Sequence, residues 1–287
     1  MTYYGIMNIK IFRQLLELAI AEDLSDEGDV TSKAIFQDNK ITTTLISKDT
    51  GVFAGAECLL ETFRELDRNV QVRFFVKDGD SLQPDTEVAE IAGKAVSILQ
   101  AERIAINFIS FLSGIATSAK KHVEAAKHSG NAVILDTRKT LPGYRDLSKY
   151  AVQVGGGKNH RMGLYDMVMI KDNHIDAAGG IPQAVEAVRQ KWGSRFHIEV
   201  ECRTIEHVRE ALSLSVDYIM LDNMSPEEVT EAVSMKSGNV WYEVSGNMNE
   251  ERIAQYSGLG IDFISVGGIT HSVRAFDFSL RIPENAV

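Results

Sequence analysis

Basic side chains gather in one window of an acidic chain. Between positions 136 and 175 lie seven Lys and Arg residues and four Asp residues, a formal charge of +3 in a chain of −10. Guanidinium groups match the paired oxygens of carboxylates and phosphates, and ammonium groups add point charges. The window therefore predicts a site for a small polyanion, built from Arg138, Lys139, Arg145, Lys149, Lys158, Arg161 and Lys171, with His160 and His174 as further donors.

Carboxylates form a second group of candidates. Glu201 and Asp222 each follow an apolar run, and Glu199 lies two residues before Glu201. Two carboxylates at neighbouring strand ends can hold Mg²⁺ together with water and substrate oxygens. They can equally accept hydrogen bonds from ribose hydroxyls. Glu199 shares a strand face with Glu201, where it either points into a barrel or pairs with a neighbouring Lys or Arg.

Small residues form the third group. Ser245-Gly246-Asn247 and Gly267-Gly268 follow the last two apolar runs, where barrels often bind phosphate through backbone N–H groups. Together the three groups suit a substrate with a phosphate, a middle rich in hydroxyls or bound to metal, and an anionic far end. A phosphorylated sugar diphosphate that reacts with an aromatic carboxylate has this outline.

The spacing of six short apolar runs indicates the elements that position these groups. The marker residues after the runs are 35, 30, 21, 23 and 22 positions apart, and each interval accommodates one strand–loop–helix–loop unit. Six units predict an incomplete α/β barrel whose strands end at a common site. The runs are 133–135, 167–170, 198–200, 218–221, 241–244 and 263–266, and the markers are Asp136, Lys171, Glu201, Asp222, Ser245 and Gly267.

The first part of the chain has a different pattern. Apolar residues at helical spacing from Phe12 to Ile20 predict an early helix, and a longer stripe predicts a helix from about Gln100 to Ala126. Between them, strands are expected at 41–47, 72–76, 88–92 and 95–99, in an antiparallel or mixed sheet.

Composition restricts the class of protein. A chain of 287 residues with 44% hydrophobic residues is long enough for a large packed core. Its net charge of −10 argues against nucleic-acid binding. The two cysteines, Cys58 and Cys202, give no disulfide framework, and no run approaches the ~18–20 apolar residues of a membrane span. We expect a soluble, cytoplasmic protein.

Several longer stretches make the chain similar to the quinolinate phosphoribosyltransferase family, also called carboxylating nicotinate-nucleotide pyrophosphorylases. The resemblance extends over nearly the whole chain. Its most specific stretches are 136–143 (DTRKTLPG), 155–161 (GGGKNHR) and 170–174 (IKDNH), supported by 22–23, 28–32, 101–103, 113–117, 221–223 and 270–272.

The resemblance implies a fold and a reaction. The fold is an N-terminal α+β open sandwich domain (1–115, joined by 274–287) and an incomplete α/β barrel (116–273). The reaction transfers the phosphoribosyl group of phosphoribosyl pyrophosphate to quinolinate and releases pyrophosphate and CO₂, with Mg²⁺ as cofactor. The product is nicotinate mononucleotide, a precursor of NAD. A homodimer or a multiple of dimers is implied, without nucleic-acid or membrane partners.

The resemblance also assigns roles to residues. Lys139, Lys171, Glu201 and Asp222 are the implied catalytic residues, and Glu201 and Asp222 serve the metal, partly through substrate and water. Arg103 is implied to reach the site of a neighbouring subunit. The implied substrate-binding residues are Arg103, Thr137, Arg138, Lys139, Thr140, His160, Arg161, Lys171, Glu201, Asp222, Ser245, Gly246, Asn247, Val266, Gly267, Gly268 and His271. Arg145, Lys149 and Lys158 fall outside these roles and are expected to be surface charges.

Three alternatives remain open at this point. A Schiff-base aldolase would also place a Lys at a strand end, with Lys171 or Lys139 as nucleophile. A paralogue of the same fold would use another aromatic acid. A non-catalytic anion-binding protein would lack a reason to combine carboxylates with the basic cluster. Asn247, Met248 and Gly268 depart from the commoner residues of relatives, so they bear on the details of phosphate binding.

Overall fold

The computed structural model describes residues 7–283, which divide into two compact units. The first contains residues up to 120, then 142–156, then the chain from 273 onward; the second contains 121–141 and 157–272. Segment 142–156 groups with the first unit, whereas the sequence analysis placed it in the barrel. Positions 1–6 and 284–287 of the predicted N-terminal domain lie outside the described residues.

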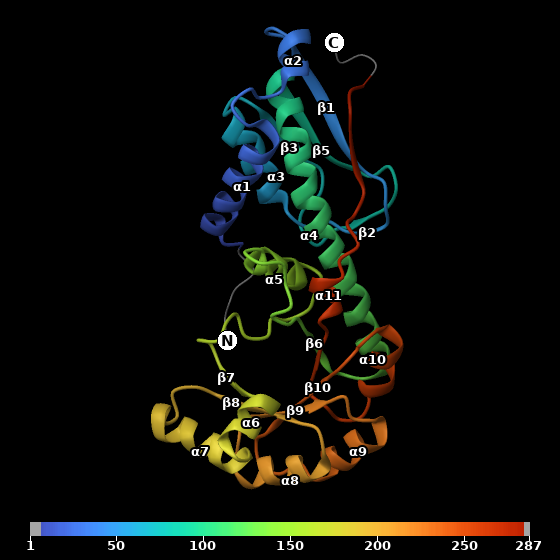
Figure 1. The fold of residues 1–287 in the computed structure, drawn as a ribbon. Helices are drawn as coiled ribbons and strands as arrows, with labels where there is room; N and C mark the ends of the chain where they lie inside the picture. The colour runs from blue at the N-terminus through green and yellow to red at the C-terminus, as the bar shows by residue number, and fades with distance from the viewer. Residues whose placement is uncertain (1–6, 284–287) are drawn as a thin grey trace. The chain divides into compact units, whose positions relative to one another are not determined.

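An antiparallel sheet with the strand order β12-β1-β5-β3 is the centre of the first unit. Its outer strand β12 comes from the end of the chain and pairs with β1, with Leu280 opposite Leu45. The elements of this unit are α1 (Ile9–Leu24), α2 (Val30–Ile35), β1 (Lys40–Ser47), β2 (Gly51–Val52), α3 (Ala56–Leu66), β3 (Gln71–Phe74), β4 (Ser81–Leu82), β5 (Glu87–Lys94), most of α4 (Ala95–Ser129), α5 (Arg145–Val154) and β12 (Phe278–Arg281), as Figure 1 shows.

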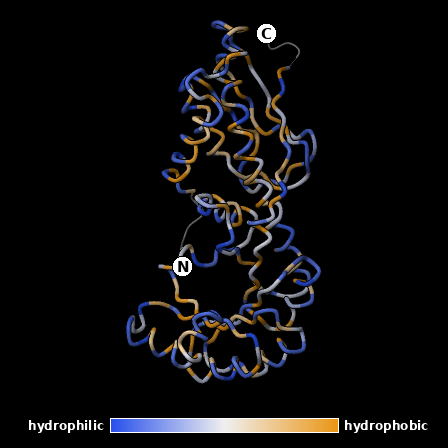
Figure 2. Tube along the Cα trace, viewed as in Figure 1, coloured by the Kyte–Doolittle hydropathy of each residue, from blue (hydrophilic) through white to orange (hydrophobic). Residues whose placement is uncertain are grey.

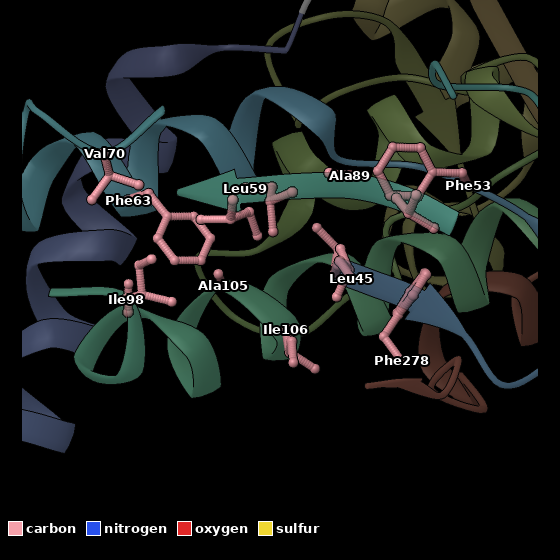
Figure 3. Close-up of a cluster of buried hydrophobic side chains, with 14 of the residues drawn as sticks. Leu45, Phe53, Leu59, Phe63, Val70, Ala89, Ile98, Ala105, Ile106 and Phe278 are labelled. Atoms are coloured by element: carbon pink, nitrogen blue, oxygen red, sulfur yellow. The ribbon is translucent and has the colours of Figure 1, made fainter. Parts of the chain in front are cut away.

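The core of this unit joins the sheet to α3 and α4. Leu45 on β1 and Ala89 on β5 are fully buried, as are Leu59 on α3 and Ile98 on α4. Figure 3 shows these side chains with Phe278 of β12 in one cluster. Burial of apolar surface stabilises such a cluster by about 25 cal/mol per Å², so the predicted sandwich has a core of its own.

Helix α2 begins at a residue of one of the family-like stretches. Asp29 is its N-cap, and its carboxylate Oδ1 accepts hydrogen bonds from the backbone N–H groups of Thr31 and Ser32 at 2.9 and 3.0 Å. These N–H groups have no partner inside the helix, which is why Asp is favoured there. The stretch 28–32 thus has a structural reason in addition to its resemblance.

Helix α4 begins earlier than the sequence analysis predicted. Residues 95–99, expected to form a strand, are its first turn, and the helix runs from Ala95 to Ser129. Strand β5 passes directly into the helix, and Ile98 and Ala101 are both buried at the i, i+3 spacing of a helix. Gly130 follows its end as predicted, and a Cβ there would lie 1.9 Å from the carbonyl oxygen of Ser257.

By length and composition α4 could also cross a membrane, but half of its most apolar window is buried inside the protein. Its buried residues Ile98, Ala105 and Ile109 pack in the core of the first unit. A long apolar helix with this burial is typical of the core helix of a folded domain.

Helix α5 belongs to the first unit through several contacts. Tyr144, its N-cap, stacks against Phe108 of α4 with ring centroids 6.2 Å apart, and the Tyr150 hydroxyl donates to the Asp78 carboxylate. Lys149 is only 2% exposed. The prediction that Lys149 is a surface charge is therefore wrong: the apolar face of α5 is buried, and Lys149 lies on that face.

The second unit contains the predicted incomplete barrel. Six parallel strands have the order β6-β11-β10-β9-β8-β7, so the first strand lies beside the last and the sheet is open between β6 and β7. All six predicted strands are confirmed. The elements are β6 (Val133–Leu135), β7 (Val168–Ile170), α6 (Asp172–Ala178), α7 (Ile181–Trp192), β8 (Ile198–Cys202), α8 (Ile205–Ser213), β9 (Tyr218–Asp222), α9 (Pro226–Ser234), β10 (Trp241–Ser245), α10 (Glu250–Tyr256), β11 (Phe263–Ser265) and α11 (Gly268–His271).

Helices α7, α8 and α9 lie one after another along this unit (Figure 1). Hydrophobic and hydrophilic residues alternate along them in Figure 2, as expected of helices that bury one side. The loops that enter α8, α9 and α10 are short because an N-cap side chain ends each: Thr204, Ser225 and Asn249 accept from the backbone N–H three residues later. Short capped loops fix the residues at the carboxyl ends of the strands.

Candidate active site

A cavity of about 810 Å³ lies at the carboxyl ends of the barrel strands, entirely within the second unit. Such a volume accommodates a ligand of several hundred daltons. Its lining residues are Thr137, Arg138, Lys139, His160, Arg161, Met169, Lys171, Glu201, Met220, Asp222, Asn223, Glu243, Ser245, Gly246, Asn247, Met248, Ser265, Gly267, Gly268 and His271.

Most of the site residues expected from the sequence line this cavity. Three do not: Arg103 is exposed on α4 in the first unit, Thr140 is partly buried beyond the loop after β6, and Val266 is buried behind it. The lining also contains residues that the sequence analysis left out of the site: Met169, Met220, Asn223, Glu243, Met248 and Ser265. Glu243 had a sequence signal, because it precedes Ser245 by two positions as Glu199 precedes Glu201.

Arg161 lies at the base of the basic side of the cavity. It is only 6% exposed, and its Nη1 donates to the carbonyl oxygen of Met167 at 3.1 Å. Burial, with the nearby positive charge of Arg138, lowers the pKa of Arg161. Two guanidinium groups held close together favour an anion between or above them, since its charge relieves their repulsion.

A buried imidazole with two carboxylates lies beside this pair. His160 Nε2 is 3.2 Å from Oε2 of Glu199 and 3.4 Å from Oε2 of Glu243, and both carboxylates are almost completely buried. The backbone N–H of Arg161 donates to Nδ1 of the ring at 2.6 Å. Asp136, fully buried, accepts from the backbone N–H of His160 at 2.9 Å. The imidazole is therefore fixed on both nitrogens by the protein.

Protons in this cluster are shared. Burial raises the pKa of Glu199 to about 7, and the nearby charge of Glu243 acts in the same direction. Burial opposes a charge on His160, but attraction from Glu243 and Glu199 outweighs it and raises the pKa of His160. The three groups titrate as one unit. This combination of two carboxylates and one imidazole could also ligate a cation, but the adjacent Arg161 guanidinium already supplies positive charge to Glu199.

Glu201 and Asp222, the predicted metal residues, lie on the opposite side of the lining. Lys171 Nζ donates to Oε2 of Glu201 at 2.9 Å, and Glu201 is 7% exposed. Arg203, which the sequence analysis did not select, has Nη2 3.7 Å from Oε1 of Glu201 and Nε 3.8 Å from Oδ2 of Asp222. Oxygen donors of this kind suit Mg²⁺, so the donor set fits the predicted cofactor.

The loops after β10 and β11 complete the cavity with small residues. Gly246 has φ +112°, and a Cβ there would lie 2.1 Å from Oδ1 of Asn223. Its neighbour Asn247 has φ +48°. The hydroxyl of Thr270 donates to the carbonyl oxygen of Lys139 at 2.8 Å and ties the loop after β11 to the loop after β6. The backbone approaches the cavity closely here, as a phosphate site requires.

The charges of the lining favour an anionic ligand. Arg138, Lys139, Arg161 and Lys171 supply four formal positive charges, and Glu201, Asp222 and Glu243 supply three negative ones, in a chain of −10. Separated basic and acidic sides can bind two reactants and stabilise charge that develops between them.

Comparison with known sequences gives two family matches. The C-terminal domain of quinolinate phosphoribosyl transferase matches residues 115–281, and the N-terminal domain of the same enzyme matches residues 29–113. Together they cover most of the chain.

Individual relatives agree with these matches. A probable carboxylating nicotinate-nucleotide pyrophosphorylase of Bacillus subtilis is 42% identical over 96% of this chain and 95% of its own. A mitochondrial decarboxylating quinolinate phosphoribosyltransferase of Nicotiana tabacum is 41% identical over 94% of this chain and 82% of its own.

Solved structures agree as well. The nicotinate-nucleotide pyrophosphorylase of Francisella tularensis has a TM-score of 0.93 at 38% identity, covering 97% of this chain and 98% of its own. The NadC structure of Streptococcus pyogenes has a TM-score of 0.92 at 38% identity, covering 96% and 97%. The fold, the cavity and these relatives lead to one conclusion: the chain belongs to the quinolinate phosphoribosyltransferase family.

Proposed function

We propose that the protein transfers the phosphoribosyl group of phosphoribosyl pyrophosphate to the ring nitrogen of quinolinate, with loss of the 2-carboxyl group. The products are nicotinate mononucleotide, pyrophosphate and CO₂, so the reaction serves NAD biosynthesis. One observation carries this proposal: a single cavity holds a basic side for a dicarboxylate and a carboxylate pair opposite small-residue loops. Family membership favours a transferase over an aldolase or a non-catalytic anion-binding protein.

The basic side binds the aromatic dicarboxylate. Arg138 and Arg161 suit two carboxylate groups, and the buried position of Arg161 fixes the direction of its guanidinium. Holding quinolinate there places its ring nitrogen toward the ribose. Positioning of this kind supplies much of the acceleration in a two-substrate transfer.

The acidic side stabilises the transfer itself. The bond between the anomeric carbon and the pyrophosphate oxygen breaks as the ring nitrogen attacks, and the ribose gains oxocarbenium character, as in glycoside hydrolysis. Glu201 and Asp222 present negative charge to this cation. Lys139 and Lys171 balance the charge of the departing pyrophosphate. Decarboxylation follows because the pyridinium nitrogen accepts the electron pair, and a proton then takes the place of the carboxyl group at carbon 2.

We propose Mg²⁺ as the cofactor, held by Glu201 and Asp222 with oxygens of water and substrate. When bound it neutralises pyrophosphate oxygens and makes pyrophosphate a better leaving group. The residues Ser245, Gly246, Asn247, Gly267 and Gly268 are proposed to hold the 5′-phosphate, since their backbone lines the cavity.

A homodimer with a shared site is the proposed assembly, with Arg103 of one subunit serving its neighbour. Its exposed position on α4 is compatible with that role. A cytoplasmic location is proposed because both cysteines are free and buried, as in proteins of a reducing compartment.

The deciding experiment incubates the protein with quinolinate, phosphoribosyl pyrophosphate and Mg²⁺ and measures nicotinate mononucleotide and released CO₂. Nicotinate and other pyridine and benzene carboxylates serve as competing acids. Product from one of these, with none from quinolinate, would overturn the substrate assignment and favour a paralogue of the same fold. Loss of turnover when Mg²⁺ is removed with a chelator, and its return on adding Mg²⁺, is the expected result for the cofactor.

A further inference from the structure

Arg203 lies among three carboxylates from three neighbouring strand ends. Its Nη2 is 2.6 Å from Oδ2 of Asp172, which follows β7, and 3.7 Å from Oε1 of Glu201 on β8. Its Nε is 3.8 Å from Oδ2 of Asp222 at the end of β9. The guanidinium thus connects three adjacent strands of the barrel from the loop that directly follows β8.

Asp172 fixes the position of this guanidinium. Its Oδ1 accepts from the backbone N–H of Asn173 at 2.8 Å, which leaves Oδ2 directed at Arg203. The hydrogen bond from Asp172 and its charge raise the pKa of Arg203. The distances to Glu201 and Asp222 are longer than hydrogen bonds, so Arg203 acts on these two through charge.

Glu201 is consequently placed between two cations. Lys171 contacts Oε2 at 2.9 Å and Arg203 faces Oε1. Lys171, Glu201 and Asp222 line the cavity, whereas Arg203 is not among the described residues that line it. Arg203 therefore approaches the carboxylate pair from outside the cavity, and a divalent cation that binds the pair competes with a positive charge already present.

We propose that Arg203 is a positioning residue that orients Glu201 and Asp222 and weakens their affinity for a bare divalent cation. The inference rests on the metal role of these two carboxylates in the proposed function. It gives the ligand-free protein a low affinity for metal. Metal then binds well only when pyrophosphate oxygens contribute negative charge of their own.

The expected size of the effect follows from the exposure of Arg203, whose side chain is 51% exposed. Screening near it is close to that of water, where a unit charge at ion-pair distance changes the binding of a divalent cation by about tenfold. Arg203→Gln removes the charge and keeps a polar side chain of similar reach. Arg203→Lys keeps the charge.

The test measures Mn²⁺ binding to the ligand-free full chain by the electron paramagnetic resonance of free Mn²⁺. Arg209→Gln is the matched control, because Arg209 is 55% exposed on α8 of the same unit and pairs with Glu206 and Glu231 rather than with the site. We expect about tenfold tighter Mn²⁺ binding in Arg203→Gln, and values within about twofold of wild type in Arg203→Lys and Arg209→Gln. Thermal unfolding by circular dichroism checks that all variants are folded.

Two results would overturn the proposal. One is equal or weaker Mn²⁺ binding in Arg203→Gln than in wild type. The other is tighter binding that persists in the double variant Arg203→Gln/Glu201→Gln, since the gain must then come from another site. Failure of the proposed function is a separate result, because it appears as absent turnover of quinolinate with any divalent metal, whereas the Mn²⁺ comparison needs no turnover.

Discussion

Replacement of Gly246 by Ala tests the reasoning about the loop after β10. The new Cβ would lie 2.1 Å from Oδ1 and 2.6 Å from Cγ of Asn223, at a φ of +112°. Strain of a non-glycine residue in such a conformation costs about 1–3 kcal/mol, and the overlap costs about 1–3 kcal/mol more. We expect a loss of about 2–6 kcal/mol in the free energy of unfolding, a large part of typical stability.

Matched variants separate the two contributions. Gly238 also has a positive φ, +68°, but a Cβ there meets nothing within 4 Å, so Gly238→Ala should show only backbone strain, about 1–2 kcal/mol. Asn223 has φ +56°, so Asn223→Gly is compatible with its backbone and removes the overlapping side chain. Adding it to Gly246→Ala should restore about 1–3 kcal/mol.

Urea denaturation of the four proteins measures these differences. If Gly246→Ala loses no more stability than Gly238→Ala, or if Asn223→Gly restores nothing, the close approach of this loop to Asn223 is not what requires glycine. The same variant tests function: displacement of the loop should raise KM for phosphoribosyl pyrophosphate and leave KM for quinolinate unchanged. A rise in KM for quinolinate alone would contradict the assignment of this loop to phosphate.

Two further predictions concern binding and pH. Arg138→Ala and Lys171→Ala should each weaken quinolinate binding by tenfold or more, about 1.4 kcal/mol, with circular dichroism spectra like the wild type; near-wild-type affinity by calorimetry would refute the role of the basic side. Hydrogen bonds from Ser32 and Thr31 lower the pKa of Asp29, the N-cap of α2. The carboxylate therefore contributes stability above its ordinary pKa of about 3.9, and this contribution is lost as the pH falls below it. The stability advantage of wild type over Asp29→Asn, measured by urea denaturation, should be present at pH 6 and smaller at pH 3; an equal difference at both would show that the charge of Asp29 is not involved.

The barrel was predictable because its strands are short apolar runs at regular intervals, each followed by a polar residue or glycine. Those positions meet at one sheet edge, which is why Glu201, Asp222 and Lys171 could be placed at a common cavity from sequence. The family, the enzyme class and the fold expected from the resemblance are confirmed.

Other features had no such local pattern. Residues 95–99 are apolar enough for a strand, and only the continuation of burial into α4 makes them helical. Lys149 is polar by type but lies on the buried face of α5. Arg203 follows a strand in an ordinary loop, and its role depends on Asp172 and Asp222, which are distant in sequence. Contacts of this kind are set by the tertiary fold.

The pairing of β12 with β1 has a consequence for synthesis on the ribosome. Strand β1 ends at Ser47 and its partner begins at Phe278, so 231 further residues must be translated before the partner exists. At about 5–20 residues per second this takes about 10–50 s. Throughout that interval the nascent sheet has an unpaired edge, which is a template for association with other chains. A chaperone that shields strand edges would therefore matter most for this protein while its last residues are still being made.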